Sequence, residues 1–161
     1  MTVAAPDLAV ATGFQRDQYV AAPAFHPAKA ALVRFAAHFV ANVAFGHVDE
    51  TFDGVGIANE GRLRQMVELK KQKPDLNVLL SIGGWGSGRF SEMAANEKYR
   101  KAFAKDCRRV VKEYGLDGID IDWEYPTSNA AGISSSPDDT KNFTLLMRDI
   151  RKAIGPKKLL T

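Results

Sequence analysis

Short apolar runs alternate with longer amphipathic segments along the chain. The run at 38–48 is rich in β-forming residues, and the segment at 76–82 is almost continuously apolar, as in a strand covered on both faces. Residues 60–73 and 96–114 instead repeat apolar side chains at helical spacing, and the polar segment 49–59 is predicted to be a loop. The pattern therefore predicts strands that alternate with helices.

Local signals indicate where two of the predicted helices begin and end. Gly115 follows the helix at 96–114, where a left-handed C-cap is expected. Ser136 as N-cap and Pro137 as first helical residue, with Asp139 three positions after the cap, predict the start of another helix. That helix is expected to end at Gly155.

Further strands complete the predicted α/β pattern. Residues 118–124 form one, and 157–161 resemble the start of another. The first unit is ambiguous, because either 8–14 or 19–25 could be its strand, followed by a helix at 28–39. Four strand–helix units and the edge of a fifth imply a parallel sheet with external helices. A closed (β/α)8 TIM barrel needs about 250 residues, so the fold is either a smaller open sheet or a partial barrel.

Composition narrows the function without identifying it. The 161 residues are 45% hydrophobic and 25% charged, with a net charge of +3, and the basic residues are dispersed, so neither nucleic acid nor a membrane surface is an expected partner. Cys107 is the only cysteine, and the three histidines do not cluster, so no metal site is expected. No apolar run reaches the roughly 18 residues of a membrane span, and no signal peptide is evident.

The segment DGIDIDWEYP at 117–126 is the most unusual stretch, because a predicted buried strand carries several carboxylates. Side chains two apart share a face of a strand, so three acidic residues line one side: Asp120, Asp122 and Glu124. The alternate residues would pack against the helices: Ile119, Ile121 and Trp123. Asp117 breaks the parity and is expected to brace the start of the strand.

Crowded carboxylates cannot all ionise near neutral pH, so this row should share protons and raise at least one pKa. A carboxylic acid with a raised pKa at the mouth of a cavity is what a general acid requires, and Glu124 is the last of the three on the strand. The alternative is a set of acidic residues at a solvated strand end.

Two motifs carry a resemblance to a known family. DGIDIDWE at 117–124 matches the DxxDxDxE signature of glycoside hydrolase family 18, the chitinase family, and SIGGWGSG at 81–88 matches its SxGG motif. The segment VAFGHV at 43–48 resembles the family's second strand. The resemblance covers about 40–161 and matches residues 1–40 poorly. It implies that residues 1–161 are a partial catalytic domain of the chitinase-type TIM barrel.

The resemblance also implies a chemistry: retaining hydrolysis of β-1,4 bonds between N-acetylglucosamine units, in which the substrate's own acetamide is the nucleophile. Glu124 would be the acid and base, Asp122 would orient the acetamide, and Asp120 would lie deeper. Ser81 would support that deeper aspartate from the neighbouring strand. Chitin or its oligosaccharides would be the partner, no cofactor is implied, and the expected location is extracellular.

Several residues are expected to line the sugar cleft by the same resemblance: Phe45, Gly83, Gly84, Trp85, Gly86 and Tyr125. Each has another interpretation. Gly83 and Gly84 could simply allow a tight turn, whereas Trp85 and Phe45 could be core residues.

Family catalysis also uses residues of the sixth and eighth barrel strands, which this chain does not contain. We therefore expect an N-terminal half-barrel, whose activity in isolation is an open question and whose exposed sheet edges favour self-association. The alternatives are a non-catalytic chitin-binding lectin of the same family, an endo-β-N-acetylglucosaminidase, and a structural domain without a ligand.

Overall fold

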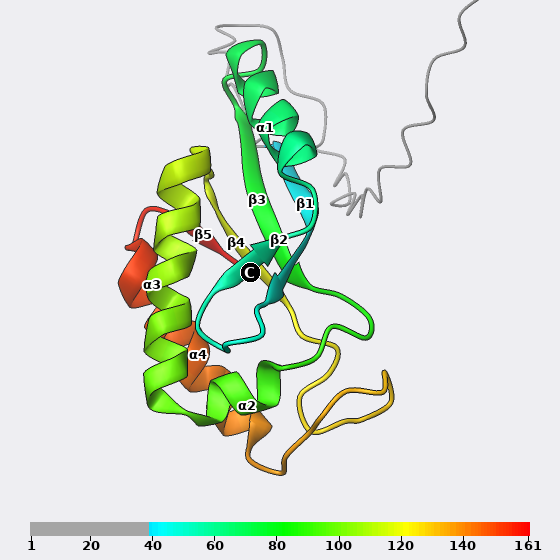
Figure 1. The fold of residues 1–161 in the computed structure, drawn as a ribbon. Coiled ribbons are helices and arrows are strands. Elements are labelled where there is room, and N and C mark those ends of the chain that lie inside the picture. Colours follow the sequence, from blue (N-terminus) through cyan, green and yellow to red (C-terminus); the bar gives the residue numbers. More distant parts are fainter. Residues whose placement is uncertain (1–38) are drawn as a thin grey trace, which may run out of the picture. The chain divides into compact units, whose positions relative to one another are not determined.

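The computed structural model describes residues 39–161 (Figure 1). Its elements, in order along the chain, are β1 (Phe39–Val48), β2 (Val55–Ile57), α1 (Glu60–Glu68), β3 (Leu76–Gly83), α2 (Phe90–Ala95), α3 (Glu97–Tyr114), β4 (Gly118–Asp122), α4 (Asp139–Ile154) and β5 (Leu159–Leu160). A 3-10 turn at Leu69–Lys71 continues α1. The two candidates for a first strand, 8–14 and 19–25, lie outside the described residues, as does the predicted helix at 28–39 apart from Phe39.

The strands form one five-stranded sheet in the order β2-β1-β3-β4-β5. Strands β1, β3, β4 and β5 pair in parallel, which confirms the predicted parallel sheet. The prediction of a loop throughout 49–59 was wrong, because β2 pairs antiparallel with the end of β1, with Val55 opposite Val48. A strand of three residues is too short to show the alternation by which strands are recognised.

The segment after β3 contains a second element that the pattern did not indicate. Helix α2 has six residues and buries Phe90, Met93 and Ala94. Fewer than two turns cannot display a helical repeat, so this stretch was indistinguishable from the glycine-rich turn before it.

Helix α4 begins at Asp139, two residues later than predicted. The expected capping contacts are nevertheless present around Ser136. Its hydroxyl accepts a hydrogen bond from the Asp138 amide at 3.2 Å, and its own amide donates to the Asp139 carboxylate at 2.7 Å. The contacts therefore close a turn that precedes the helix rather than its first turn.

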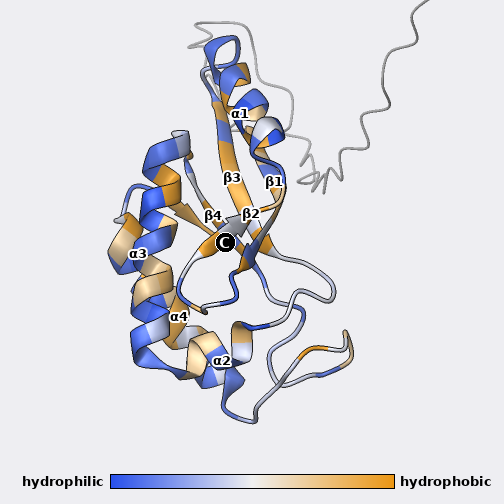
Figure 2. Ribbon diagram, viewed as in Figure 1, coloured by the Kyte–Doolittle hydropathy of each residue, from blue (hydrophilic) through white to orange (hydrophobic). Residues whose placement is uncertain are grey.

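The hydrophobic core lies between the sheet and the helices, and Figure 2 shows hydrophobic residues concentrated on β3 and β4. Val78, Leu80 and Ile82 of β3 pack with residues of all four helices, including Leu63, Phe90, Phe103 and Leu146. Alternate positions of the strands point to the other face. A predicted C-cap is confirmed at Gly115, which has φ 69° and closes α3.

Some apolar side chains are exposed at the ends of the strands, including Phe39 and Val40 on β1 and Leu159 on β5. The self-association expected from the sequence stays a prediction, and these side chains are where it would be sought. Within residues 39–161, no helix is both long and apolar enough to span a membrane.

Candidate active site

The predicted row of carboxylates lies on β4 and on the residues that follow it. Strand β4 ends at Asp122, two residues earlier than predicted, and its register places Asp120 opposite Ser81 and Asp122 opposite Gly83 of β3. Asp120 and Asp122 are half-buried, whereas Ile119 between Gly118 and Asp120 is fully buried on the helix side. The two aspartates therefore share the face of the sheet that the helices do not cover.

Asp120 is held by hydroxyl and amide donors that reach it from three other strands or their ends. The Ser81 hydroxyl donates to Asp120 Oδ2 at 2.8 Å, as expected from the resemblance. The Thr161 hydroxyl donates to Oδ1 at 2.8 Å, and Asn42 Nδ2 donates to Oδ2 at 3.3 Å. Thr161 follows β5 and Asn42 lies on β1, so the Asp120 carboxylate ties four neighbouring strands together.

Asp122 lies between the other two carboxyl groups of the row. Burial raises its pKa, and the negative charges of Glu124 and Asp120 raise it further. The sequence predicted a raised pKa for at least one carboxyl group of the row, and the structure shows it for Asp122. A proton is consequently retained in this cluster to a higher pH than on an isolated aspartate.

The exposed aromatic residues Trp85 and Tyr125 come from the loops after β3 and β4, which leave the same end of the sheet in Figure 1. Their rings meet edge to face with centroids 6.3 Å apart. The neighbouring Glu124 carboxylate raises the pKa of the Tyr125 hydroxyl, with smaller contributions from burial and Asp122. The Glu124 carboxylate therefore lies close to the Tyr125 hydroxyl. Trp85 is 65% exposed, so it is not a core residue.

The glycines of the SxGG motif allow the backbones to approach closely. A side chain at Gly83, which has φ 130°, would lie 2.0 Å from the carbonyl oxygen of Asp122. The Gly84 amide donates to that same oxygen at 2.8 Å. At Gly84 a Cβ would lie 2.9 Å from the Phe45 ring, which is partly exposed above it. The turn interpretation of Gly83 and Gly84 thus has a physical basis, and Gly86 shares their positive φ, at 77°.

Asp117 lies at the opposite end of β4 and takes no part in the row. Its Oδ2 accepts from the Val78 amide at 2.8 Å and from Lys70 Nζ at 2.6 Å. Its expected role of bracing the start of the strand matches these contacts, which hold β4 against β3.

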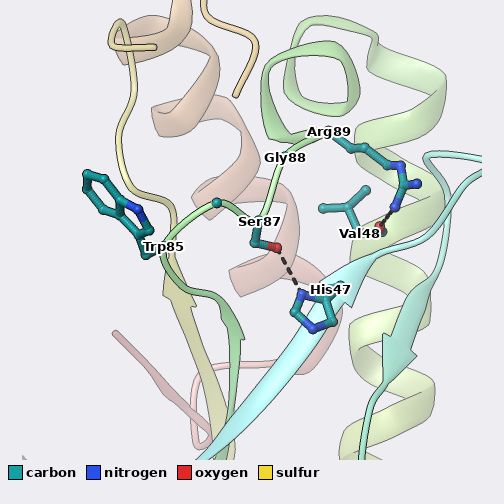
Figure 3. Close-up of a pocket in the computed structure, with 7 residues that line it drawn as sticks. His47, Val48, Trp85, Ser87, Gly88 and Arg89 are labelled. Atoms are coloured by element: carbon teal, nitrogen blue, oxygen red, sulfur yellow. Dashed lines mark hydrogen bonds between the residues drawn. The ribbon is translucent and has the colours of Figure 1, made fainter. Parts of the chain in front are cut away.

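A small hollow of about 260 Å³ lies beside the site, between the end of β1 and the loop after β3 (Figure 3). His47 Nδ1 is 2.9 Å from the Ser87 hydroxyl, and Arg89 donates to the Val48 carbonyl at 3.2 Å. The indole of Trp85 points away from this pair in Figure 3. The three carboxylates do not line the hollow. All three are half-buried, and the enclosed cavity expected around them stays a prediction.

Nothing in the described part of the chain suggests a metal centre, since residues 39–161 contain no group of three or more His, Cys, Asp or Glu placed to hold an ion.

Comparisons with known proteins agree on one family. The family model described as Glycosyl hydrolases family 18 matches residues 19–161, so the match begins earlier than the motifs alone indicated. Chitinase A1 of Niallia circulans is 40% identical over 110 residues, which are 63% of this chain and 16% of that protein. Probable chitinase 2 of Drosophila melanogaster is 38% identical over 103 residues, covering 63% of this chain and 20% of that protein.

Two solved structures are similar in fold as well as in sequence. The chitinase domain of the spore coat protein CotE from Clostridium difficile superposes with a TM-score of 0.73 and 45% identity, covering 75% of this chain and 35% of that one. A family 18 N-acetylglucosaminidase from Paenibacillus barengoltzii gives a TM-score of 0.70 and 47% identity, covering 75% of this chain and 37% of that one. The predicted fold class is therefore confirmed: the described sheet and helices form a partial TIM barrel of the chitinase type. The chain spans about a third of these two structures.

Proposed function

The chain belongs to glycosyl hydrolases family 18, and from that premise we propose that it acts on chitin or chitooligosaccharides by hydrolysing β-1,4 bonds between N-acetylglucosamine units. The observation that carries the proposal is the position of Asp122 between Asp120 and Glu124, with a raised pKa caused by burial and by both neighbours. Three neighbouring carboxyl groups along the end of β4 and the residues that follow it can hold and transfer a proton.

In the proposed reaction the acetamide of the substrate supplies the nucleophile. Its carbonyl oxygen attacks the anomeric carbon while protonated Glu124 gives its proton to the departing glycosidic oxygen. The oxazolinium-like intermediate carries a positive charge. Water, deprotonated by the Glu124 carboxylate, then adds to the anomeric carbon and opens the ring. The two displacements retain the β configuration.

Asp122 and Asp120 have supporting roles in this mechanism. Asp122 accepts a hydrogen bond from the acetamide N–H, which turns the carbonyl oxygen toward the anomeric carbon and stabilises the developing positive charge. Asp120, fixed by Ser81, Thr161 and Asn42, holds a second carboxyl group beside Asp122 with which it can share a proton.

The exposed aromatic pair would contact the sugar. Trp85 and Tyr125 present ring faces and edges beside the carboxylates, and flat apolar rings of this kind stack on pyranose rings. In this proposal Gly83 and Gly84 bring the loop that carries Trp85 close to β4, and Gly86 lets that loop turn, while the Phe45 ring over Gly84 borders the cleft.

A second candidate activity is release of N-acetylglucosamine from short oligosaccharides. It is favoured by the 47% identity with the N-acetylglucosaminidase from Paenibacillus barengoltzii. The two candidates share the same carboxylates and differ in the length of substrate that they accept.

The test measures release of a fluorescent aglycone by the chain from 4-methylumbelliferyl glycosides of N-acetylglucosamine, chitobiose and chitotriose. We expect turnover that Glu124→Gln abolishes, since removal of the acid that protonates the leaving group leaves no replacement. Glu92→Gln, the same change at an exposed glutamate of α2, is the matched control and should leave turnover unchanged.

The pattern of substrates separates the candidates. Preference for chitobiose and chitotriose glycosides supports the chitinase activity, whereas preference for the monosaccharide glycoside supports the second candidate. Binding to colloidal chitin without turnover of any glycoside would overturn both and support the lectin alternative.

A further inference from the structure

The segment 123–127, which carries Glu124 and Tyr125, is anchored at its start by aromatic packing. The Trp123 indole is 5% exposed and stacks on Phe90 of α2, with ring centroids 5.4 Å apart and planes inclined by 14°. Phe143 of α4 meets the same indole edge to face at 6.1 Å. Helices α2 and α4 therefore hold the residue immediately before Glu124 from two sides.

The same two helices hold the other end of this segment through one carboxylate. Asp139, the first residue of α4, is fully buried, and its Oδ1 accepts a hydrogen bond from the Ser91 hydroxyl of α2 at 2.7 Å. Its Oδ2 accepts from the Thr127 amide at 3.1 Å and from the Ser136 amide at 2.7 Å. The Asp139 carboxylate consequently links a helix, both ends of the loop after β4 and the start of α4.

Helix capping alone does not account for these contacts. A capping residue needs only the bond to the Ser136 amide, whereas the bonds to Ser91 and Thr127 reach beyond the helix. Thr127 has φ 65°, in the left-handed region that β-branched residues rarely adopt. A backbone in that conformation persists only where surrounding contacts impose it, and the bond from Asp139 is one such contact.

Helices α2 and α4, which hold this segment, are also fixed relative to each other. Arg100 of α3 is buried, donates to the Ala94 carbonyl near the end of α2 at 2.8 Å, and pairs with Asp149 of α4 at 3.0 Å. Helix α2 therefore cannot shift relative to α4 without breaking a buried ion pair or hydrogen bond.

We propose that Asp139, together with Ser91, is a positioning residue that fixes residues 124–126 between two anchors. The Glu124 carboxylate is thereby held beside the Tyr125 hydroxyl and the aspartates of β4. Only three residues separate Trp123 from Thr127, so fixing both ends determines the path between them. The importance of this position for catalysis rests on the proposed role of Glu124, but the positioning itself can be measured without substrate.

The experiment is an NMR titration of the chain labelled with [13Cζ]tyrosine, with the Tyr125 signal assigned from Tyr125→Phe. Because the nearby Glu124 carboxylate is the main cause of the raised Tyr125 pKa, the titration reports on their separation. Asp139→Asn keeps the shape of the side chain but replaces one acceptor oxygen with an NH2 group. We expect the Tyr125 pKa to fall toward that of free tyrosine and the Thr127 amide to exchange about tenfold faster with solvent.

Asp138→Asn is the matched control, since it makes the same substitution and the same charge change one residue earlier, where the side chain is exposed and does not cap the helix. It should leave both measurements unchanged. The proposal is overturned if Asp139→Asn alters neither Tyr125 titration nor Thr127 exchange, or if the control alters both equally.

Ser91→Ala provides a milder test if Asp139→Asn does not fold, because it removes only one donor. We expect a smaller change in the same direction, and Ser91→Thr, which restores a hydroxyl, should return the Tyr125 titration toward the original. An unchanged titration in a folded Ser91→Ala chain would also overturn the proposal. Failure of the proposed hydrolysis would appear separately, either as no turnover of any glycoside by the unaltered chain or as turnover that persists in Glu124→Gln.

Discussion

Near the carboxyl ends of β3 and β4, the two faces of the sheet carry different kinds of side chain. Toward the helices, Leu80 and Ile82 of β3 and Ile119 of β4 are 0–1% exposed. On the other face, at alternate positions of the same strands, Asp120 and Asp122 are half-buried and their charges repel. Burial of apolar side chains on one face stabilises the fold. The other face can therefore hold carboxyl groups that destabilise the fold but can transfer protons.

The largest test of this comparison is a truncation on the covered face. Leu80→Ala should lower the free energy of unfolding by about 2–5 kcal/mol, because it leaves a cavity in the packed core. Val40→Ala, on the uncovered face of β1 with 53% exposure, should change it by only about 0.5 kcal/mol. Urea unfolding followed by circular dichroism measures both. Equal losses in the two variants would show that the faces do not differ as described.

A smaller loss of unfolding free energy is expected when the buried Ser81 hydroxyl, which donates to Asp120, is removed. Ser81→Ala removes a donor to Asp120 and should cost about 1.5 kcal/mol, near the lower end for hydrogen bonds to charged groups. The Ser81→Ala/Asp120→Asn double-mutant cycle in urea isolates the interaction from other consequences of each change. A coupling free energy of zero would mean that the hydroxyl does not stabilise the carboxylate.

The contrast between the faces also explains what could be predicted from the sequence. Alternation within 117–126 was sufficient to place Asp120 and Asp122 on one side and Ile119 on the other, because strand periodicity is local information. The tertiary partners of these side chains could not be predicted in this way. That Thr161 donates to Asp120 depends on the pairing of β4 with β5, which no local pattern contains.

Asp139 illustrates the same limit at a helix terminus. Its spacing from Ser136 indicated a capping contact, and that contact is present. Its bonds to Ser91 and Thr127 could not be inferred, because Ser91 belongs to a helix of six residues with no detectable repeat. Short elements and side chains that bridge them are therefore where reasoning from sequence fails in this protein, and they surround the candidate site.

The smallest expected effect is a change in the pH dependence of stability at the centre of the uncovered face. Burial and the charges of Glu124 and Asp120 raise the Asp122 pKa above its ordinary value of 3.8, so the folded chain binds this proton more tightly than the unfolded chain. The resulting stability is fully present below about pH 3.8 and is lost as the pH rises through the folded-state pKa.

Asp122→Asn cannot ionise, so it should gain stability relative to the wild type between pH 3 and pH 7. Urea unfolding of both chains across that range measures the difference, and Asp75→Asn, at an exposed position, is the matched control. A difference that stays constant with pH would mean that neither burial nor the neighbouring carboxylates raise the Asp122 pKa in the folded chain, which would contradict the electrostatic part of the comparison between the two faces.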